Sequence, residues 1–363
     1  MDFQHLIFRQ YRRKIIRQHE LNYLFWECTR RCNLNCLHCG SDCSSFSQTK
    51  DMPLEDFIKV LDDVKSKNKA KYLTVCITGG EPLLRSDLEQ AGEEITRRGF
   101  FWGIATNAML LTKERFDSLT KAGMRSLSLS FDGFEEEHNY LRQNPKSYEN
   151  ACNALKFLVE YEKNHDFIFD VVTCVHKGNL EILPKLRDDL IHRGLKRWMI
   201  YTIFPEGRAR KNDLSVSASE YKRIMDFIVE TRSYRNPEGK SIDVTYPCEG
   251  YLGDYELKVR DYYYYCSSGI NTASIMCDGS CTGCLCVRSK DFVQGNIYDE
   301  NKNVANSFMD IWNTKYQIFR NRSWAKQGKC KNCKKWKFCL GGGIHLYHDL
   351  NSGPAWCNYE LVK

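Results

Sequence analysis

Three cysteines near the start of the chain have the spacing of a metal-binding loop. Cys32, Cys36 and Cys39 form a C-x3-C-x2-C pattern directly after a short apolar run. Thiolate is a soft ligand that binds zinc and iron–sulfur clusters. Three thiolates can bind three irons of a [4Fe–4S] cube, which leaves the fourth iron without a protein ligand. A structural zinc site is the ordinary alternative, but three ligands at this spacing without a nearby fourth are unusual for it.

The fourth iron, which has no protein ligand, indicates what chemistry this loop can support. S-adenosylmethionine (SAM) can chelate such an iron through its amino and carboxylate groups, which places the sulfonium beside a reduced cluster. Electron transfer then breaks a carbon–sulfur bond and produces a 5′-deoxyadenosyl radical. The spacing therefore predicts a cluster that initiates radical chemistry.

A second group of cysteines lies in the last third of the chain. The whole chain has 18 cysteines, and reducing compartments rarely use disulfides, so metal ligation is the natural explanation. Zinc is again the alternative. The candidate ligands in this group are Cys266, Cys277, Cys281, Cys284, Cys286, Cys330, Cys333, Cys339 and Cys357.

Composition indicates a folded protein and excludes several classes. The chain has 363 residues, of which 42% are hydrophobic, and this excludes a disordered chain. No apolar stretch reaches the length of a transmembrane segment and no secretory signal stands at the start, which predicts a cytoplasmic protein. The net charge of +7 is modest for this length and does not indicate nucleic-acid binding.

Residues 1–21 are predicted to form a basic helix. Such an amphipathic helix can lie on a membrane or a partner, or it can cap the fold as a solvated helix, which we favour. The basic residues are Arg9, Arg12, Arg13, Lys14 and Arg17.

Residues 22–247 alternate short apolar runs with amphipathic helical stretches, as parallel βα units do. Gly123 and Gly194 fit the left-handed positions at helix ends. Six such units predict an α/β fold, either an open doubly wound sheet or a partial (βα)6 TIM-like barrel, and both bind ligands at the carboxyl ends of the strands. The predicted strands are Asn22–Glu27, Lys71–Thr78, Phe100–Thr106, Ser126–Phe131, Phe167–Thr173 and Lys196–Ile203.

Residues 248–363 lose this alternation and are rich in glycine, cysteine and aromatic residues. We expect a second, small cysteine-rich domain here. A segment with so little helical periodicity would have difficulty burying a core alone. Bound metal is therefore expected to supply part of its folding free energy.

The cysteine loop resembles the signature of the radical SAM superfamily, whose fold is a partial (βα)6 barrel. Further segments that this family requires follow in the right order after the predicted strands. They are Thr78-Gly79-Gly80-Glu81-Pro82, Ala105-Thr106-Asn107, Ser128 to Gly133 with Arg142 beyond, Val175–Asn179, and Pro205 to Ala209.

This resemblance implies a SAM-binding site at the strand ends. Gly79 to Pro82 would contact the amino group of SAM, where glycine permits close approach of the backbone. Ser130 would bond the ribose and Arg142 the carboxylate, which suits a guanidinium. His38 would stack on the adenine. The full implied set is His38, Gly79, Gly80, Glu81, Pro82, Thr106, Asn107, Ser130, Asp132 and Arg142, while Cys28 and Cys43 are expected to be bystanders.

The carboxyl-terminal cysteines resemble the SPASM domain, which holds up to two auxiliary [4Fe–4S] clusters. By this resemblance, one site has the four thiolates Cys330, Cys333, Cys339 and Cys357. The other site keeps Cys266 and Cys284, but the next ligand of the family falls on Gly343. Either one iron stays open, or the gap is filled by Cys277, Cys281 or Cys286.

Similar SPASM enzymes mostly modify peptides or proteins. The resemblance therefore implies an oxidoreductase that abstracts hydrogen from a peptide or protein and takes electrons from a flavodoxin or ferredoxin. The layout also resembles a group paired with a small lipoprotein. Sulfatase maturation is disfavoured, because Leu285 stands where that subgroup has aspartate. Radical modification of a tetrapyrrole side chain is the alternative.

Overall fold

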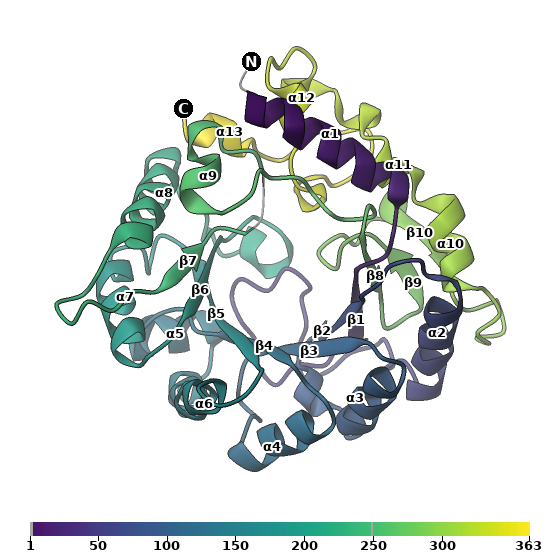
Figure 1. The fold of residues 1–363 in the computed structure, drawn as a ribbon, viewed down its shortest axis with the longest axis horizontal. Helices are drawn as coiled ribbons and strands as arrows, with labels where there is room; N and C mark the ends of the chain where they lie inside the picture. Colours follow the sequence, from purple (N-terminus) through teal and green to yellow (C-terminus); the bar gives the residue numbers. More distant parts are fainter. Residues whose placement is uncertain (1–2, 248–249) are drawn as a thin grey trace.

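The structure is a computed structural model that describes residues 3–247 and 250–363. Within these residues ten strands form one sheet, in the order β10-β9-β8-β1-β2-β3-β4-β5-β6-β7. Strands β1 to β7 are parallel, and the sheet curves with helices on its outer side (Figure 1). The parallel strands are β1 (Tyr23–Thr29), β2 (Thr74–Gly79), β3 (Phe101–Thr106), β4 (Ser126–Ser130), β5 (Ile168–Val175), β6 (Arg197–Thr202) and β7 (Asp243–Thr245).

The strand order distinguishes between the two predicted architectures. Consecutive strands are neighbours in the sheet, so every right-handed crossover places its helix on the same face. This confirms the α/β partial barrel and excludes the doubly wound sheet. The six predicted strands are all present, with their ends shifted by at most a few residues. The additional strand β7 was not predicted, because three residues are too few to show an alternating pattern.

Amphipathic helices cover the outer face of the sheet. Gly123 and Gly194 have φ of 101° and 87°, as predicted for helix ends. The helices are α2 (Leu54–Lys67), α3 (Leu88–Arg97), α4 (Lys113–Lys121), α5 (Glu135–Arg142), α6 (Ser147–Glu162), α7 (Leu183–His192) and α8 (Ala218–Ser233).

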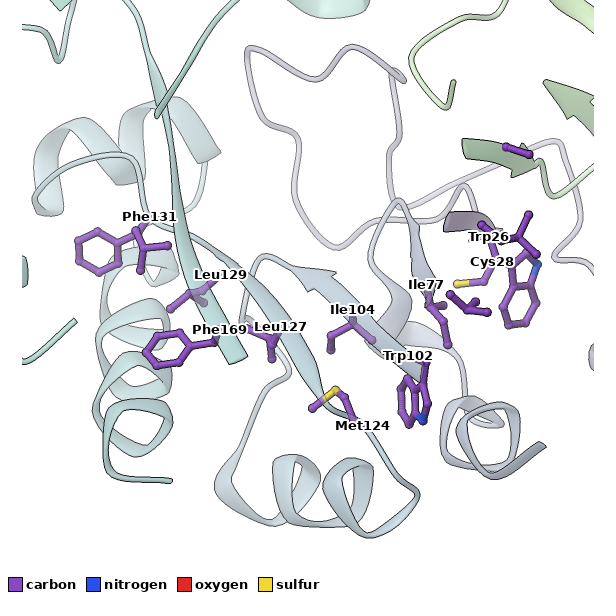
Figure 2. Close-up of a cluster of buried hydrophobic side chains, with 14 of the residues drawn as sticks. Trp26, Cys28, Ile77, Trp102, Ile104, Met124, Leu127, Leu129, Phe131 and Phe169 are labelled. Carbon is purple, nitrogen blue, oxygen red and sulfur yellow. The ribbon is translucent and has the colours of Figure 1, made fainter. Parts of the chain in front are cut away.

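The main core lies between the sheet and these helices. Figure 2 shows outward-facing strand side chains such as Trp26, Trp102 and Phe169 within it. Trp26 stacks on Phe57 of α2, with ring centroids 3.9 Å apart. Gly92 of α3 leaves room for Trp102, since a Cβ there would lie 2.1 Å from the indole. This packing fixes the strands, so their carboxyl ends can hold a site rigidly.

The cysteine-rich region continues the barrel sheet. Strand β8 (Thr272–Ile275) pairs in parallel with β1, and β9 (Ser280–Thr282) and β10 (Val293–Asn296) extend the edge in antiparallel fashion. The boundary expected at residues 247 and 248 stays a prediction, and Cys248 and Glu249 lie outside the described residues. The helices of this region are short: α9 (Glu256–Val259), α10 (Phe308–Lys315), α11 (Gln317–Arg320), α12 (Trp336–Cys339) and α13 (Asn358–Leu361).

The basic amino-terminal segment forms helix α1 (Phe3–Gln18), which lies beside α12 (Figure 1). Arg12 donates through Nη2 to the carbonyl oxygen of Lys337 at 2.8 Å, and the His5 ring contacts the ring of Phe338. The helix therefore caps the cysteine-rich region, as favoured from the sequence. No helix in the described ranges has the length and apolar character that crossing a membrane requires.

One buried carboxylate makes stability depend on pH. Asp170 of β5 lies on the opposite strand face from Phe169 and hydrogen bonds to Ser128, and its Oδ1 has no other partner in the described structure. Burial raises its pKa to about 6, above the value of an unfolded chain. The folded state thus holds the proton more tightly, so stability is lost as the pH rises through about 6.

We expect Asp170→Asn to remove this loss, because the amide stays neutral. The variant should exceed the parent in free energy of unfolding by roughly 2–3 kcal/mol at pH 8, and by about half as much at pH 5. Chemical denaturation at the two pH values measures the difference. If the gain in free energy of unfolding is the same at the two pH values, Asp170 is ionised at both of them.

Candidate active site

The cysteine loop, residues 30–53, links β1 to α2 and turns back on its own start. The Cys32 amide donates to the carbonyl oxygen of Ser44 at 2.7 Å, beside a bridge between Arg31 and Ser44. This turn brings Cys32, Cys36 and Cys39 to the wall of one pocket of about 590 Å³ at the carboxyl ends of the strands. The three thiols expected to act together are therefore neighbours.

The glycines after β2 let the loop and the strand end meet closely. A Cβ at Gly79 would lie 2.1 Å from the carbonyl oxygen of Thr29, and one at Gly80 would lie 2.0 Å from that of Arg31. Gly79 also has φ of 141°, which disfavours other residues. Both glycines line the pocket, so their backbone is open to a ligand.

Glu81 is a buried carboxylate fixed by three donors. Its Oε1 accepts from Thr106 Oγ1 at 2.8 Å and from the Leu83 amide at 3.2 Å, and its Oε2 accepts from the Asn107 amide at 2.8 Å. Burial outweighs these hydrogen bonds and raises its pKa to about 7. The side chain is therefore held rigid at the pocket wall, where it can accept a hydrogen bond from an amine.

The ends of β3 and β4 complete this wall. Asn107 donates through Nδ2 to Cys32 Sγ at 3.7 Å and to Asn33 Oδ1 at 2.9 Å, which ties the first thiol to the strand end. Ser130, the last residue of β4, also lines the pocket. Hydroxyl and amide groups thus face the same cavity as the thiols.

Arg142 connects a buried carboxylate to the second thiol. Its Nε donates to Asp132 Oδ2 at 2.6 Å, and its Nη1 donates to Cys36 Sγ at 3.9 Å. Burial alone would raise the pKa of Asp132, but the Arg142 guanidinium holds it well below its ordinary value. Arg142 therefore presents a fixed positive charge to the pocket.

His38 is a half-buried pocket residue whose Nδ1 has no hydrogen-bond partner in the described structure. Burial lowers its pKa to about 3, so the imidazole is neutral at neutral pH. A neutral ring at the pocket wall suits stacking on an aromatic ligand.

Two residues of the expected SAM-binding set lie outside the pocket wall. Pro82 begins the short turn Pro82–Leu84 and is buried. Asp132 is fully buried and accepts the Cys174 amide at 2.9 Å as well as Arg142. Pro82 shapes the turn and Asp132 supports Arg142, and the expectation that these two residues contact SAM stays a prediction.

Cys43 lies beside the three cysteines of the triplet, and the expectation that it is a bystander stays a prediction. Its side chain lines the pocket, and its thiol hydrogen bonds to Cys39, which lowers the pKa of Cys39 to about 5. The sequence signal was a fourth cysteine four residues after Cys39. Cys28, by contrast, is fully buried in the main core near Trp26, as expected (Figure 2).

Arg208 holds the cysteine loop from the far end of the barrel. Its Nε donates to the carbonyl oxygen of Cys36 at 2.7 Å, and its Nη1 donates to that of Cys43 at 2.8 Å. Its own amide donates to the carbonyl oxygen of Cys39 at 3.0 Å. The segment that follows β6 thus fixes the loop at three points, a role that no local sequence pattern revealed.

We expect Arg208→Ala to loosen the loop without removing a thiol. Loss of three charge-assisted hydrogen bonds, to the carbonyl oxygens of Cys36 and Cys43 and to Asp42 Oδ1, should make loop opening roughly tenfold more frequent or more. Iron of the loaded protein should then pass faster to a coloured chelator. Arg210→Ala is the matched control, because Arg210 contacts Glu206 and not the loop. Equal rates of iron release in both variants would show that Arg208 does not hold the cysteine loop closed.

A second thiol pocket lies in the cysteine-rich region, near the carboxyl terminus. Its volume is about 1040 Å³, and its wall contains the four cysteines that the sequence grouped together. They are Cys330, Cys333, Cys339 and Cys357. Cys330 and Cys357 are 27 positions apart in the chain, yet both line this pocket.

The remaining cysteines do not gather so fully. Cys284 and Cys286 hydrogen bond to each other, while Cys266 lines a separate small cavity. Cys277 donates to Glu27 Oε1 at 3.2 Å, and Cys281 is fully buried in β9. Among the three candidates to fill the gap at Gly343, Cys286 is therefore the one beside Cys284. Across the described residues, no three His, Cys, Asp or Glu side chains are grouped as a single metal ion would require.

Two sequence profiles match the chain. The profile described as the Radical SAM superfamily matches residues 26–190, and the profile of an iron–sulfur cluster-binding domain, SPASM, matches residues 266–334. AdoMet-dependent heme synthase from Methanosarcina barkeri is 27% identical over 354 residues, which are 93% of this chain and 96% of that protein. PqqA peptide cyclase from Bradyrhizobium diazoefficiens is 28% identical over 186 residues, 51% of this chain and 47% of the cyclase.

Solved structures share the fold. SuiB from Streptococcus suis, bound to S-adenosylmethionine, superposes with a TM-score of 0.71 at 18% identity, covering 93% of this chain and 76% of SuiB. The complex of anSMEcpe with AdoMet and the Cp18Cys peptide gives a TM-score of 0.70 at 19% identity and covers 93% of each chain. The fold of this chain is thus shared with both over nearly its whole length.

Proposed function

This chain belongs to the radical SAM superfamily and carries a SPASM iron–sulfur domain, and from that premise we propose that it modifies a peptide or protein substrate. The family implies a [4Fe–4S] cluster, SAM and auxiliary clusters, so the structural-zinc alternative is set aside. The observation that carries the proposal is the meeting of three thiols and three strand ends at one pocket.

The residues present fit this pair of cofactors. Cys32, Cys36 and Cys39 offer three thiolates, which suits a cluster with one open iron. The glycine backbone beside them has no room for a side chain, and Glu81 and Arg142 supply an acceptor and a positive charge for an amino acid group. His38 adds a neutral ring for an aromatic base.

When bound, the reduced cluster and SAM supply a 5′-deoxyadenosyl radical that can abstract hydrogen from a substrate. We assign positioning tasks to the residues of this chain. Glu81 accepts from the amino group, Arg142 binds the carboxylate, and Ser130 bonds the ribose. Asp132 keeps Arg142 in place and charged, because its buried carboxylate faces the guanidinium at 2.6 Å.

Two of the similar proteins support a peptide as the substrate. SuiB, which shares the fold, binds the precursor peptide SuiA, and PqqA peptide cyclase is a further relative directed at a peptide.

The test supplies candidate peptides to the anaerobically reconstituted enzyme. Small proteins encoded beside the gene, including any lipoprotein, would be incubated with SAM and a strong reductant. We expect one of them to stimulate 5′-deoxyadenosine release and to change in mass by loss of hydrogen. Deoxyadenosine release with no mass change in any peptide would count against the proposed substrate class.

Modification of a tetrapyrrole is the second candidate function. It is favoured because a heme synthase aligns with more of this chain than the peptide cyclase does. AdoMet-dependent heme synthase aligns with 93% of this chain, whereas the peptide cyclase aligns with 51%. We choose Fe-coproporphyrin III as the tetrapyrrole probe; it is the product for which a relative from Methanosarcina barkeri, Fe-coproporphyrin III synthase, is named, and a heme synthase would have to start from a porphyrin of this kind. Stimulated deoxyadenosine release and a mass change of this porphyrin would replace the peptide proposal. Sulfatase-type oxidation stays disfavoured by Leu285.

A further inference from the structure

The second thiol pocket is surrounded by an unusually basic stretch of chain. Residues 326–337 read KQGKCKNCKKWK and contain no acidic residue. We call their six lysines the lysine collar: Lys326, Lys329, Lys331, Lys334, Lys335 and Lys337. Five of them are exposed and Lys335 is half-buried. The collar therefore presents a concentrated positive charge around Cys330 and Cys333.

The chain offers little to neutralise this charge. Of the residues that line the second thiol pocket, Glu360 is the one carboxylate, and it pairs with Lys329 at 2.9 Å. Helix α1 adds to the positive surface. Its Arg12 donates a hydrogen bond to the carbonyl oxygen of Lys337, and the same helix contains Arg9 and Arg13. A positive field of this kind attracts an acidic partner and raises its rate of association.

We propose that the lysine collar is the docking surface of an acidic one-electron donor protein of the flavodoxin or ferredoxin kind. The proposal rests on the proposed function, since the cluster chemistry of that function requires an electron from outside the chain. Docking there would bring the donor to the thiols nearest the collar. The donor loses one electron, the chain gains one, and no covalent bond forms or breaks at this surface.

The arrangement favours a protein donor over other anionic partners. Electron-transfer complexes are small and short-lived, and charge complementarity suits such encounters. Three of the collar lysines, Lys329, Lys334 and Lys335, line the second thiol pocket itself, and neither a nucleic acid nor a lipid surface would make use of the thiols there. An anionic membrane is nevertheless a competing occupant, because Leu6, Ile7 and Tyr11 of α1 are exposed near the basic residues. The experiment includes it as an outcome.

The test compares two charge-reversed forms of the cluster-loaded full chain. The collar variant is K331E/K334E/K337E, and the matched control is K121E/K156E/K185E, which changes the net charge equally on exposed positions of α4, α6 and α7. Binding of oxidised flavodoxin is measured by titration at low salt. We expect the collar variant to bind at least about tenfold more weakly and to lose most of the salt dependence, while the control binds like the parent.

Two further readouts locate the contact and separate the proposals. Carbodiimide cross-linking of the parent to flavodoxin should join collar lysines to donor carboxylates, as peptide mapping would show. SAM cleavage driven by flavodoxin and its reductase should fall in the collar variant, while cleavage driven by dithionite is unchanged. Absence of dithionite-driven cleavage in the parent would refute the proposed function and not the docking surface, which the titration tests alone.

Two results would overturn the docking proposal. One is equal flavodoxin affinity of the collar and control variants. The other is binding of the parent to vesicles of phosphatidylcholine and phosphatidylserine that is lost in the collar variant, without a matching loss of flavodoxin binding.

Discussion

Cys36→Ala is expected to reduce 5′-deoxyadenosine formation to the assay background while the chain stays folded and keeps iron in its second thiol pocket. Cys36 lies on the Arg142 side of the pocket, with its sulfur 3.9 Å from Nη1. The Cys43 thiol hydrogen bonds to Cys39, and a neighbouring thiol can replace a deleted ligand, so Cys39→Ala is a weaker test. Chromatography of the nucleoside products and iron analysis measure the outcome.

Cys333→Ala is the matched control for this prediction. It removes one thiol from the second pocket and leaves the first untouched. We expect it to lose iron and substrate turnover but to retain dithionite-driven SAM cleavage that is uncoupled from modification. If Cys36→Ala still cleaves SAM, the assignment of the first thiol set is wrong. If either variant loses all of its iron, the two sites are not separate.

Arg142→Met is expected to destabilise the fold and to weaken SAM binding. Methionine keeps most of the length of the side chain but leaves Asp132 charged, fully buried and without its cation. Breaking a buried ion pair from one side typically costs about 3–5 kcal/mol in free energy of unfolding. Urea denaturation measures the stability, and equilibrium dialysis against SAM measures binding.

The double variant Asp132→Asn/Arg142→Met separates the two effects. Because it leaves no uncompensated charge, it should recover a large part of the lost stability. SAM affinity should stay low, since the positive charge at the pocket wall is still missing. A single variant as stable as the parent would mean that the carboxylate and the guanidinium are not coupled in the way that their 2.6 Å separation indicates.

Local patterns of residues were enough to predict the elements and the first set of ligands. Apolar residues at a period of two or at helical spacing predicted six strands and the helices between them, because these periods follow from backbone geometry alone. The triplet Cys32, Cys36 and Cys39 was readable for the same reason: ligands within one short loop need no other element to bring them together. The glycines after β2 were readable because close backbone approach excludes side chains.

Only the tertiary structure decided which distant segments meet. Arg208 lies more than 160 positions from the loop that it holds, and β8 lies some 250 positions from β1, its partner. No local period encodes such contacts, because they depend on how the sheet curves and closes. The same cause explains why the contacts of Cys43 and Asp132 could not be predicted: whether a side chain lines a pocket or supports a neighbour is set by packing across the barrel.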